Sequence, residues 1–130
     1  MRVIAGLAKG HQLFSPEGED TRPTLDRVKE SVFSILYPYL RDSVVLDLFA
    51  GTGSLGIEAL SRGAVDADFV DNGKKAYDCI IRNLRKTRLD ENSVVVIETE
   101  YMAGNYEGYE IIKQAKYGRV YITLYRLAER

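Results

Sequence analysis

The chain has 130 residues, 45% of them hydrophobic, which fits one folded domain with a real core and is too apolar for a disordered segment. Its formal net charge of −1 excludes a uniformly basic nucleic-acid-binding protein. The single cysteine, Cys79, excludes a disulfide framework and predicts a reducing cytoplasm, and with one histidine it leaves too few ligands for a protein-built zinc site. No apolar run is long enough to span a membrane, and the start MRVIAG lacks the features of an export signal.

The first 42 residues predict a short strand pair followed by a helix. Residues 2–14 form the strand pair, which turns through Lys9 and Gly10, and a polar loop follows at 16–20. Thr24 is the expected N-cap residue of the helix, and Pro38 is its expected end. Apolar residues recur at helical spacing and are expected to face the core: Leu25, Val28, Val32, Ile35 and Leu36.

The remainder, residues 43–130, predicts strands and helices in alternation, closed by a hairpin. Strands are expected at 44–49, 69–71 and 94–97, with helices at 54–62 and 74–89 between them. This order indicates a parallel, doubly wound α/β sheet. The last residues alternate in two halves around 117–118, which predicts an antiparallel hairpin. Residues 74–88 carry six Lys or Arg against one acid, Asp78, which fits a solvated helix face as well as a nucleic-acid-binding one.

Three glycines follow the first central strand with the spacing G-x-G-x-x-G: Gly51, Gly53 and Gly56. The spacing alone is a weak signal, but here it follows a predicted strand and opens a predicted helix, which is the context of a nucleotide-binding turn. Asp71 lies twenty residues after Gly51, at the end of the next strand, where a carboxylate can accept hydrogen bonds from ribose hydroxyls. A turn without ligand and a solvated strand-end acid are the alternatives.

Asp47, four residues before Gly51, helps to choose between two ligands that fit this geometry, NAD and S-adenosylmethionine. A pyrophosphate is repelled by a nearby carboxylate, at a cost of about a few kcal/mol at intermediate dielectric. S-adenosylmethionine has no phosphate and presents a sulfonium and an ammonium, which a carboxylate attracts. The acid therefore favours S-adenosylmethionine, although it also fits a capping role toward loop amides.

Five segments in the same order resemble the bacterial 16S ribosomal RNA guanine-N2 methyltransferases, S-adenosylmethionine-dependent enzymes of Rossmann-like fold. The first three are specific and the last two are weak alone. They are RVIAGLAKGHQL (2–13), TRPTLDRVKESVF (21–33), VLDLFAGTGSLGIEALSRGA (45–64), VVVIETE (94–100, similar to a late strand) and KYGRVYITLY (116–125). Together they cover most of the chain.

One part of the family pattern is absent from the sequence. The family carries an Asn/Asp-Pro-Pro-Tyr tetrapeptide after its fourth strand, whereas the prolines here are Pro16, Pro23 and Pro38 only. After Asp90 the sequence passes directly to the segment that resembles a late strand, so the third and fourth strands of the family and their helices are expected to be missing. Either they lie outside these 130 residues, or the chain is an internally shortened form. No catalytic residue can be named without the tetrapeptide.

The expected site residues fall into two groups. We expect contact with S-adenosylmethionine from Asp47, Phe49, Gly51, Thr52, Gly53, Gly56, Asp71, Asn72, Thr21, Arg22 and Thr24. Of these, Phe49 also fits plain core packing and Asn72 a turn. Thr21, Arg22 and Thr24 are expected either to cover the methionine end of the cofactor or to hold RNA phosphate, with a loop and a helix cap as the alternative. We expect contact with RNA phosphates from Arg2, Lys9, His11, Arg27 and Lys29, with a solvated surface as the alternative.

The prediction is therefore a single α/β domain, with an N-terminal hairpin and helix at 1–42 and a Rossmann-like core at 43–130. Its expected activity is transfer of a methyl group from S-adenosylmethionine to the exocyclic N2 amine of a guanine in 16S ribosomal RNA. Ribosomal RNA or the small ribosomal subunit is the expected partner of a cytoplasmic monomer that binds no membrane. The alternatives are a non-catalytic remnant that binds RNA or cofactor, and a nicotinamide-dependent oxidoreductase, against which Asp47 argues.

Overall fold

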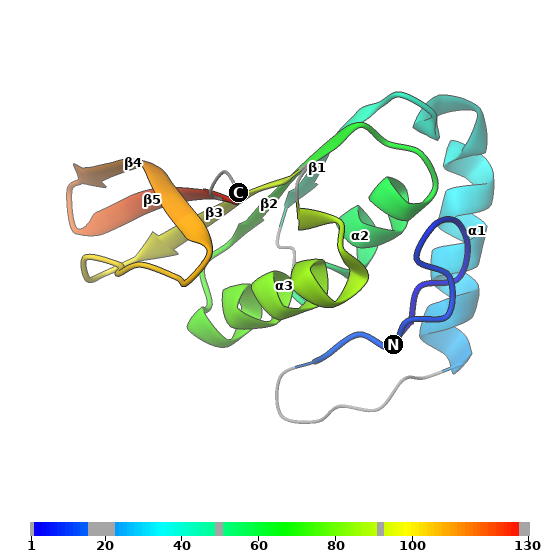
Figure 1. Cartoon of the computed structure of the whole chain (residues 1–130), viewed down its shortest axis with the longest axis horizontal. Helices are drawn as coiled ribbons and strands as arrows, with labels where there is room; N and C mark the ends of the chain where they lie inside the picture. The colour runs from blue at the N-terminus through cyan, green and yellow to red at the C-terminus, as the bar shows by residue number, and fades with distance from the viewer. Residues whose placement is uncertain (1, 16–22, 49–50, 91–92, 128–130) are drawn as a thin grey trace.

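The computed structural model describes residues 2–15, 23–48, 51–90 and 93–127 as three helices and five strands (Figure 1). In chain order they are α1 Pro23–Leu40, β1 Val44–Leu48, α2 Ser54–Ser61, β2 Asp66–Asp71, α3 Lys74–Thr87, β3 Ser93–Thr99, β4 Tyr109–Tyr117 and β5 Val120–Leu127. None of the helices in these ranges is long and apolar enough to cross a membrane.

The five strands form one sheet in the order β1-β2-β3-β5-β4. The pairs β1–β2 and β2–β3 are parallel, with Val45 beside Ala67 and Phe69 beside Val95. β5 then pairs antiparallel with both β3 and β4, and the hairpin turns at Gly118, whose φ is 61°. The predicted mixed α/β class, with a parallel centre and a closing antiparallel hairpin, is confirmed.

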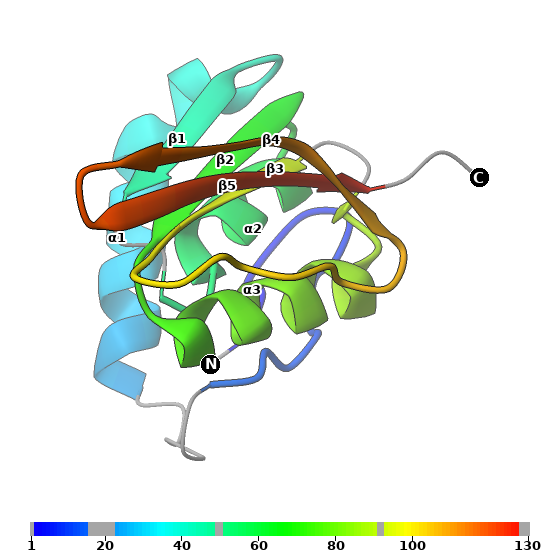
Figure 2. The same cartoon turned by 90° about the vertical axis from the view of Figure 1, so that its left-hand side faces the viewer.

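All three helices lie on one face of the sheet (Figures 1 and 2). α2 packs on β1 and β2, α3 packs on β2 and β3, and α1 packs on α2. Helices on both faces would require the strand order to reverse, but β1, β2 and β3 follow one another in a single direction across the sheet. Right-handed crossovers in a single direction place their helices on the same side. In the described part of the chain the crossovers are therefore wound on one face of the sheet.

The core lies between this helical layer and the sheet. Its fully buried side chains come from both layers and include Ile57, Phe69, Ile80, Leu84, Val95, Ile97 and Tyr125. The strand that resembles a late strand of the family, β3, follows α3 directly and lies parallel beside β2. β1 is the edge strand on the other side, and it exposes Val44 and Leu46.

The N-terminal segment and α1 differ from the sequence prediction. Residues 2–14 contain a single antiparallel bridge, between Arg2 and Gln12, where a strand pair was expected. α1 begins at Pro23, so Thr24 lies inside it, and Pro38 lies inside its last turn. Proline lacks a backbone N–H donor, so near the end of a helix it removes one hydrogen bond. The helix therefore continues for two residues past Pro38.

The apolar stripe of α1 is also not where the sequence placed it. Ile35 is 74% exposed and Val28 55%, and Val32 and Leu36 are exposed as well. The face that α1 packs against α2 carries mainly Lys29, Phe33 and Leu40. Helical spacing therefore predicted the helix correctly but not its buried side, because the ion pair of Lys29 described below directs that side toward α2.

Candidate functional site

The three glycines form the turn from β1 into α2, and two of them have backbone angles that other residues rarely adopt. Gly51 has φ of 61°, and Gly53, the N-cap residue of α2, has φ of 81°. Gly56 instead allows close packing, because a Cβ atom there would lie 2.4 Å from Cε1 of Phe69 on β2. The turn is therefore both left-handed and pressed against the sheet, as a nucleotide-binding turn requires.

Asp71, at the end of β2, holds this turn in place. Its Oδ2 accepts a hydrogen bond from the amide of Gly51 at 2.9 Å, and its Oδ1 accepts one from the amide of Gly73 at 2.8 Å. An ionised carboxylate has about four acceptor positions, so each oxygen retains capacity for one further donor. The sequence placed Asp71 at the site for ribose hydroxyls; the structure adds that it joins the ends of β1 and β2.

Asp47, in β1, lies under the start of α2 and is only 7% exposed. Its Oδ2 accepts a hydrogen bond from the amide of Gly56 at 3.0 Å. Burial, helped by repulsion from Asp71 and opposed by the Gly56 amide, raises the pKa of Asp47 to about 6. The carboxylate thus binds a loop amide, as the alternative interpretation required, and it is also a poorly compensated negative charge that a cation would stabilise.

Asn83, which the sequence analysis did not select, connects the turn to the N-terminal segment. It lies on α3, is fully buried, and its Nδ2 donates to the carbonyl of Thr52 at 2.8 Å and to that of Phe14 at 2.9 Å. Its Oδ1 accepts from the amide of Phe14 at 2.6 Å. The only sequence signal was an amide at an inward position of an amphipathic helix, between Ile80 and Thr87.

Glu58 is a second buried acid that the sequence analysis missed. Its carboxylate accepts hydrogen bonds from the amides of Ile4 at 2.9 Å and Ala5 at 3.1 Å. It also pairs with Lys29 Nζ at 3.1 Å and with Arg62 Nε at 2.7 Å. Burial alone would raise its pKa, but the amide of Ile4, Arg62 and Lys29 together outweigh burial and lower the pKa of Glu58. This cluster fastens residues 4–5 and α1 to α2.

Lys29 was expected to contact RNA phosphates, and the structure corrects that expectation. It is 5% exposed, and its ammonium donates to the carbonyl of Arg2 at 2.8 Å and to Ser54 Oγ at 2.7 Å, besides pairing with Glu58. Burial lowers the pKa of Lys29 in spite of the Glu58 carboxylate. Its charge is therefore used inside the protein and does not reach the surface.

The other expected RNA contacts are exposed but dispersed over the N-terminal segment and α1. Arg2 pairs with Asp26 at 3.5 Å. Lys9 and His11 lie on the N-terminal turn, where the His11 ring is 2.9 Å from the Ala8 carbonyl, and Arg27 lies on α1. Exposure leaves both the phosphate-contact and the solvated-surface interpretation open for these four.

The remaining expected cofactor contacts are placed only in part. Thr52 and Asn72 flank the turn, Thr52 half-buried and Asn72 exposed. Thr21, Arg22 and Phe49 lie outside the described residues, and of Thr24 only the backbone is described. The structure therefore brings together the glycines, Asp47, Asp71 and Thr52, and leaves the predicted cover over the site undescribed.

Comparison with known sequences gives one family and several curated relatives. Residues 1–96 match the family described as Conserved hypothetical protein 95. The chain is similar to ribosomal RNA small subunit methyltransferase D of Haemophilus influenzae, with 43% identity over 97 residues, and to that of Escherichia coli K12, with 39% over 95 residues. These alignments cover 75% and 73% of this chain but 50% and 48% of the relatives, so the chain spans about half their length.

Comparison with solved structures extends the similarity to the hairpin. A candidate methyltransferase of Escherichia coli, yhhF, matches with a TM-score of 0.63 and 25% identity over 98% of this chain and 97% of its own. A Thermus thermophilus protein, TTHA0928, has the same fold, with a TM-score of 0.57 and 19% identity over 95% of this chain and 98% of its own. The family match ends within β3, whereas the structural match continues through β4 and β5.

Proposed function

This chain belongs to the Conserved hypothetical protein 95 family and is similar to curated ribosomal RNA methyltransferases, and we propose that it is an S-adenosylmethionine-dependent methyltransferase. The proposed acceptor is the exocyclic N2 amine of a guanine in 16S ribosomal RNA. The observation that carries this proposal is the pair of carboxylates, Asp47 and Asp71, that meet the glycine turn from adjacent parallel strands.

The described residues fit the polar parts of S-adenosylmethionine. Asp71 has acceptor capacity left for two ribose hydroxyls, because each of its oxygens accepts a hydrogen bond from one backbone amide. Asp47 offers negative charge for the methionine ammonium or the sulfonium, directly or through water, and a cation there would return its pKa toward the ordinary range. The left-handed turn at Gly51 and Gly53 lets a ligand approach the backbone closely. Thr52 and Asn72 border the same place.

The same charges disfavour a dinucleotide. A pyrophosphate at this turn would lie near both carboxylates, and like charges at close range repel by about a few kcal/mol at intermediate dielectric. One of the amides at the N-terminus of α2, where a pyrophosphate would bind, is also already used, since the amide of Gly56 donates to Asp47. A nicotinamide-dependent oxidoreductase is therefore the weaker proposal.

When bound, S-adenosylmethionine supplies a methyl group already activated by its sulfonium, so the protein mainly has to position the two reactants. A guanine N2 amine is a weak nucleophile whose lone pair is delocalised into the ring, and acceptors on its N–H groups would direct that lone pair. In the resembled family the Asn/Asp-Pro-Pro-Tyr tetrapeptide would supply these acceptors. These 130 residues contain no Pro-Pro pair. This observation supports a second candidate, a chain that binds cofactor and RNA without turnover.

Ligand binding tests the cofactor. We expect S-adenosylhomocysteine to raise the melting temperature and to give a binding isotherm in calorimetry, whereas NAD gives neither. Asp71→Asn should weaken this binding about tenfold, because the amide would offer one acceptor where the carboxylate offers two. Binding of NAD together with no response to S-adenosylhomocysteine would refute the proposal.

Methyl transfer separates the two candidates. Labelled S-adenosylmethionine is incubated with the protein and unmethylated small ribosomal subunits or free 16S ribosomal RNA. Incorporation at a guanine supports the enzyme, and comparison of the two substrates identifies the partner. Cofactor binding without incorporation on either substrate supports binding without turnover.

A further inference from the structure

The solvent side of α3 carries a line of positive charge that the proposed cofactor site does not use. Lys75, Arg82 and Lys86 are spaced by seven and four residues, so at about 100° per residue they lie within about 40° of one another on the helix. All three are exposed. Asp78, the one acid of this helix, accepts a hydrogen bond from Tyr106 at 2.5 Å, which directs it toward the loop that follows β3. Among the described residues, neither Arg82 nor Lys86 forms an ion pair with this acid.

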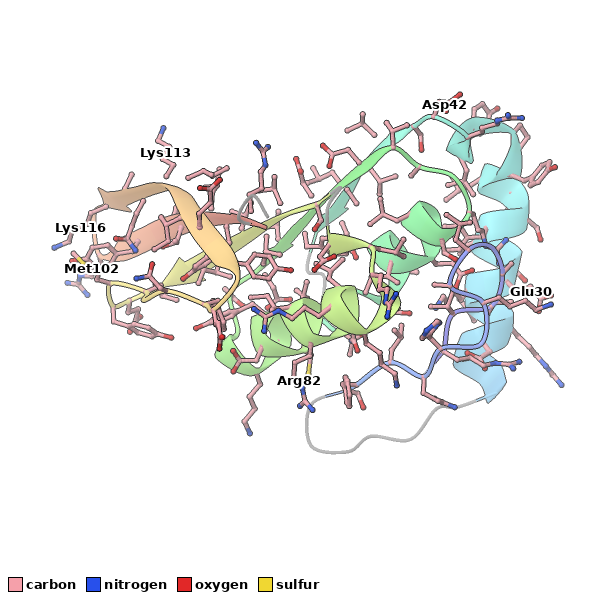
Figure 3. The ribbon with its side chains drawn as sticks, viewed as in Figure 1. Glu30, Asp42, Arg82, Met102, Lys113 and Lys116 are labelled. Carbon is pink, nitrogen blue, oxygen red and sulfur yellow. The ribbon has the colours of Figure 1, made fainter. Side chains whose placement is uncertain are left out.

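An exposed aromatic ring holds two of these cations. Phe14 is 37% exposed; its ring centroid lies 4.0 Å from the guanidinium carbon of Arg82 and 4.9 Å from the ammonium of Lys86. Contact with a ring restrains the two side chains but uses none of their N–H donors. Arg82 projects from α3 into solvent (Figure 3). The two cations are thus pre-oriented with their donors available, which lowers the entropy cost of binding an anion.

The backbone of Phe14 and the glycine turn are both hydrogen-bonded to one residue, Asn83. Asn83, next to Arg82 in sequence, binds both backbone polar groups of Phe14 and also the carbonyl of Thr52. Because Asn83 is fully buried and all of these bonds are between 2.6 and 2.9 Å, the ring, the two cations and the turn are parts of one connected unit. The positive surface therefore has a fixed position relative to the proposed cofactor site.

We propose that Phe14, Arg82 and Lys86, which we call the Phe14 patch, bind the phosphate backbone of the RNA substrate. This inference rests on the proposed function, since it assigns the RNA-contacting surface of that same enzyme. We infer a polyanion as the ligand because two exposed cations one helical turn apart, about 6 Å along the helix axis, offer charge to the phosphates of a chain without any base-specific contact. This proposal assigns an RNA contact to α3, whereas the sequence analysis expected one from Lys29 on α1.

A matched control lies at the other end of the molecule. Lys113 and Lys116 lie on β4, Lys113 in the middle of the strand and Lys116 near the β4–β5 turn (Figure 3). Lys116 also contacts a ring, with its ammonium 5.5 Å from the centroid of Tyr121. This pair has the same charge and a similar ring contact. Among the residues that the structure describes, none links this pair to the glycine turn as Asn83 links the Phe14 patch.

Fluorescence anisotropy with a fluorescein-labelled single-stranded RNA, measured over a series of salt concentrations, tests the Phe14 patch. We expect the double variant Arg82→Gln, Lys86→Gln to bind about tenfold more weakly at low salt and to reduce the slope of log affinity against log salt by about 1.4 to 2. Phe14→Leu should weaken binding about threefold with the slope unchanged, because the cations remain but lose the ring that orients them.

The RNA affinity of the control variant Lys113→Gln, Lys116→Gln should stay within about twofold of wild type. Its salt slope should change by less than half as much as that of the Arg82→Gln, Lys86→Gln variant. Equal losses in the two double variants would show general electrostatic attraction and overturn the Phe14 patch. So would wild-type affinity in the Arg82, Lys86 variant. Each variant is first checked for an unchanged melting temperature and for binding of S-adenosylhomocysteine. RNA binding that depends on the patch in a protein that ignores S-adenosylhomocysteine would refute the cofactor proposal and leave the patch standing.

Discussion

Two buried carboxylates, Glu58 and Asp47, lie within a few residues of the same helix and differ in how fully they are compensated. Glu58, on α2, has two amide donors and two cations around it, and its pKa is lowered. Asp47, in β1, has the amide of Gly56 and a neighbouring acid, Asp71, and its pKa is raised to about 6. The first region fastens elements together, and the second keeps a charge that a ligand could stabilise.

The difference shows how an acid in this fold becomes structural or available for binding. Both positions are inside the protein, so desolvation acts on both in the same direction. What separates them is the number of donors that reach them. Residues 4–5 and Lys29, distant in the chain, and Arg62, four residues further on, reach Glu58, whereas Asp47 has the amide of Gly56. A carboxylate whose partners already outweigh its burial has little to gain from a ligand, and an under-compensated one has much.

The largest effect is expected from removing the compensated acid. Glu58→Gln should lower the free energy of unfolding by about 3–5 kcal/mol, because Lys29 would keep a buried ammonium without its counter-charge. Urea denaturation measures this change. Glu30→Gln is the matched control, because Glu30 is an exposed acid on the outer side of α1 (Figure 3). It should change the free energy of unfolding by less than about 0.5 kcal/mol. A loss below about 1 kcal/mol for Glu58→Gln would mean that Lys29 and Arg62 do not depend on this carboxylate.

An intermediate effect is expected at the turn that shapes the Asp47 region. Gly56→Ala places a Cβ atom against the Phe69 ring and should cost about 1–3 kcal/mol, with weaker binding of S-adenosylhomocysteine because the amide bound to Asp47 must shift. Gly104→Ala serves as the control, since a Cβ atom there meets nothing within 4 Å. Equal melting temperatures and equal affinities for the two variants would contradict the close contact between α2 and β2.

The smallest effect is the pH dependence that Asp47 gives to stability. Its folded pKa of about 6 lies above the ordinary value of 3.8, so the protonated form is favoured on folding and its contribution is complete below 3.8. That contribution is lost as pH rises through about 6. Asp47→Asn keeps an acceptor for Gly56 and should gain about 1–3 kcal/mol over wild type between about pH 4 and pH 7.

The same variant links this titration to the ligand. Asp47→Asn should bind S-adenosylhomocysteine more weakly than wild type above pH 6, in spite of its greater stability, because the charge that attracts the ammonium is gone. Chemical denaturation and calorimetry at several pH values supply both quantities. A parallel pH dependence in the variant and in wild type would show that Asp47 is not the titrating group, and the contrast with Glu58 would then fail.

Much of the local structure could be predicted from sequence. The run at 44–49 predicted β1, the spacing of Gly51, Gly53 and Gly56 predicted the turn into α2, and Asp71 was correctly placed at the end of β2. These predictions rely on short-range rules, namely which residues tolerate a positive φ and where the carboxyl end of a strand lies. Such rules act within about twenty residues of the chain and need no tertiary information.

The errors concern which side of an element is buried. On α1, Lys29 is buried and Ile35 is exposed, the reverse of what their hydrophobicity predicts. Asn83 and Glu58 make contacts that hold the site together, although no distinctive sequence motif surrounds them. Their roles depend on partners 25 to 69 residues away in the sequence, such as Ser54 for Lys29 and Phe14 for Asn83. A pattern within one helix cannot contain that information.

The sequence by itself therefore determined the chemistry available at the turn: a left-handed backbone, an acid before it and an acid at the next strand end, since these follow from residue type and spacing. Only the tertiary structure decided that the charge of Glu58 is compensated by its partners and that the charge of Asp47 is under-compensated. Compensation is a sum over donors and charges supplied by distant segments, and at Glu58 and Asp47 that sum has opposite signs.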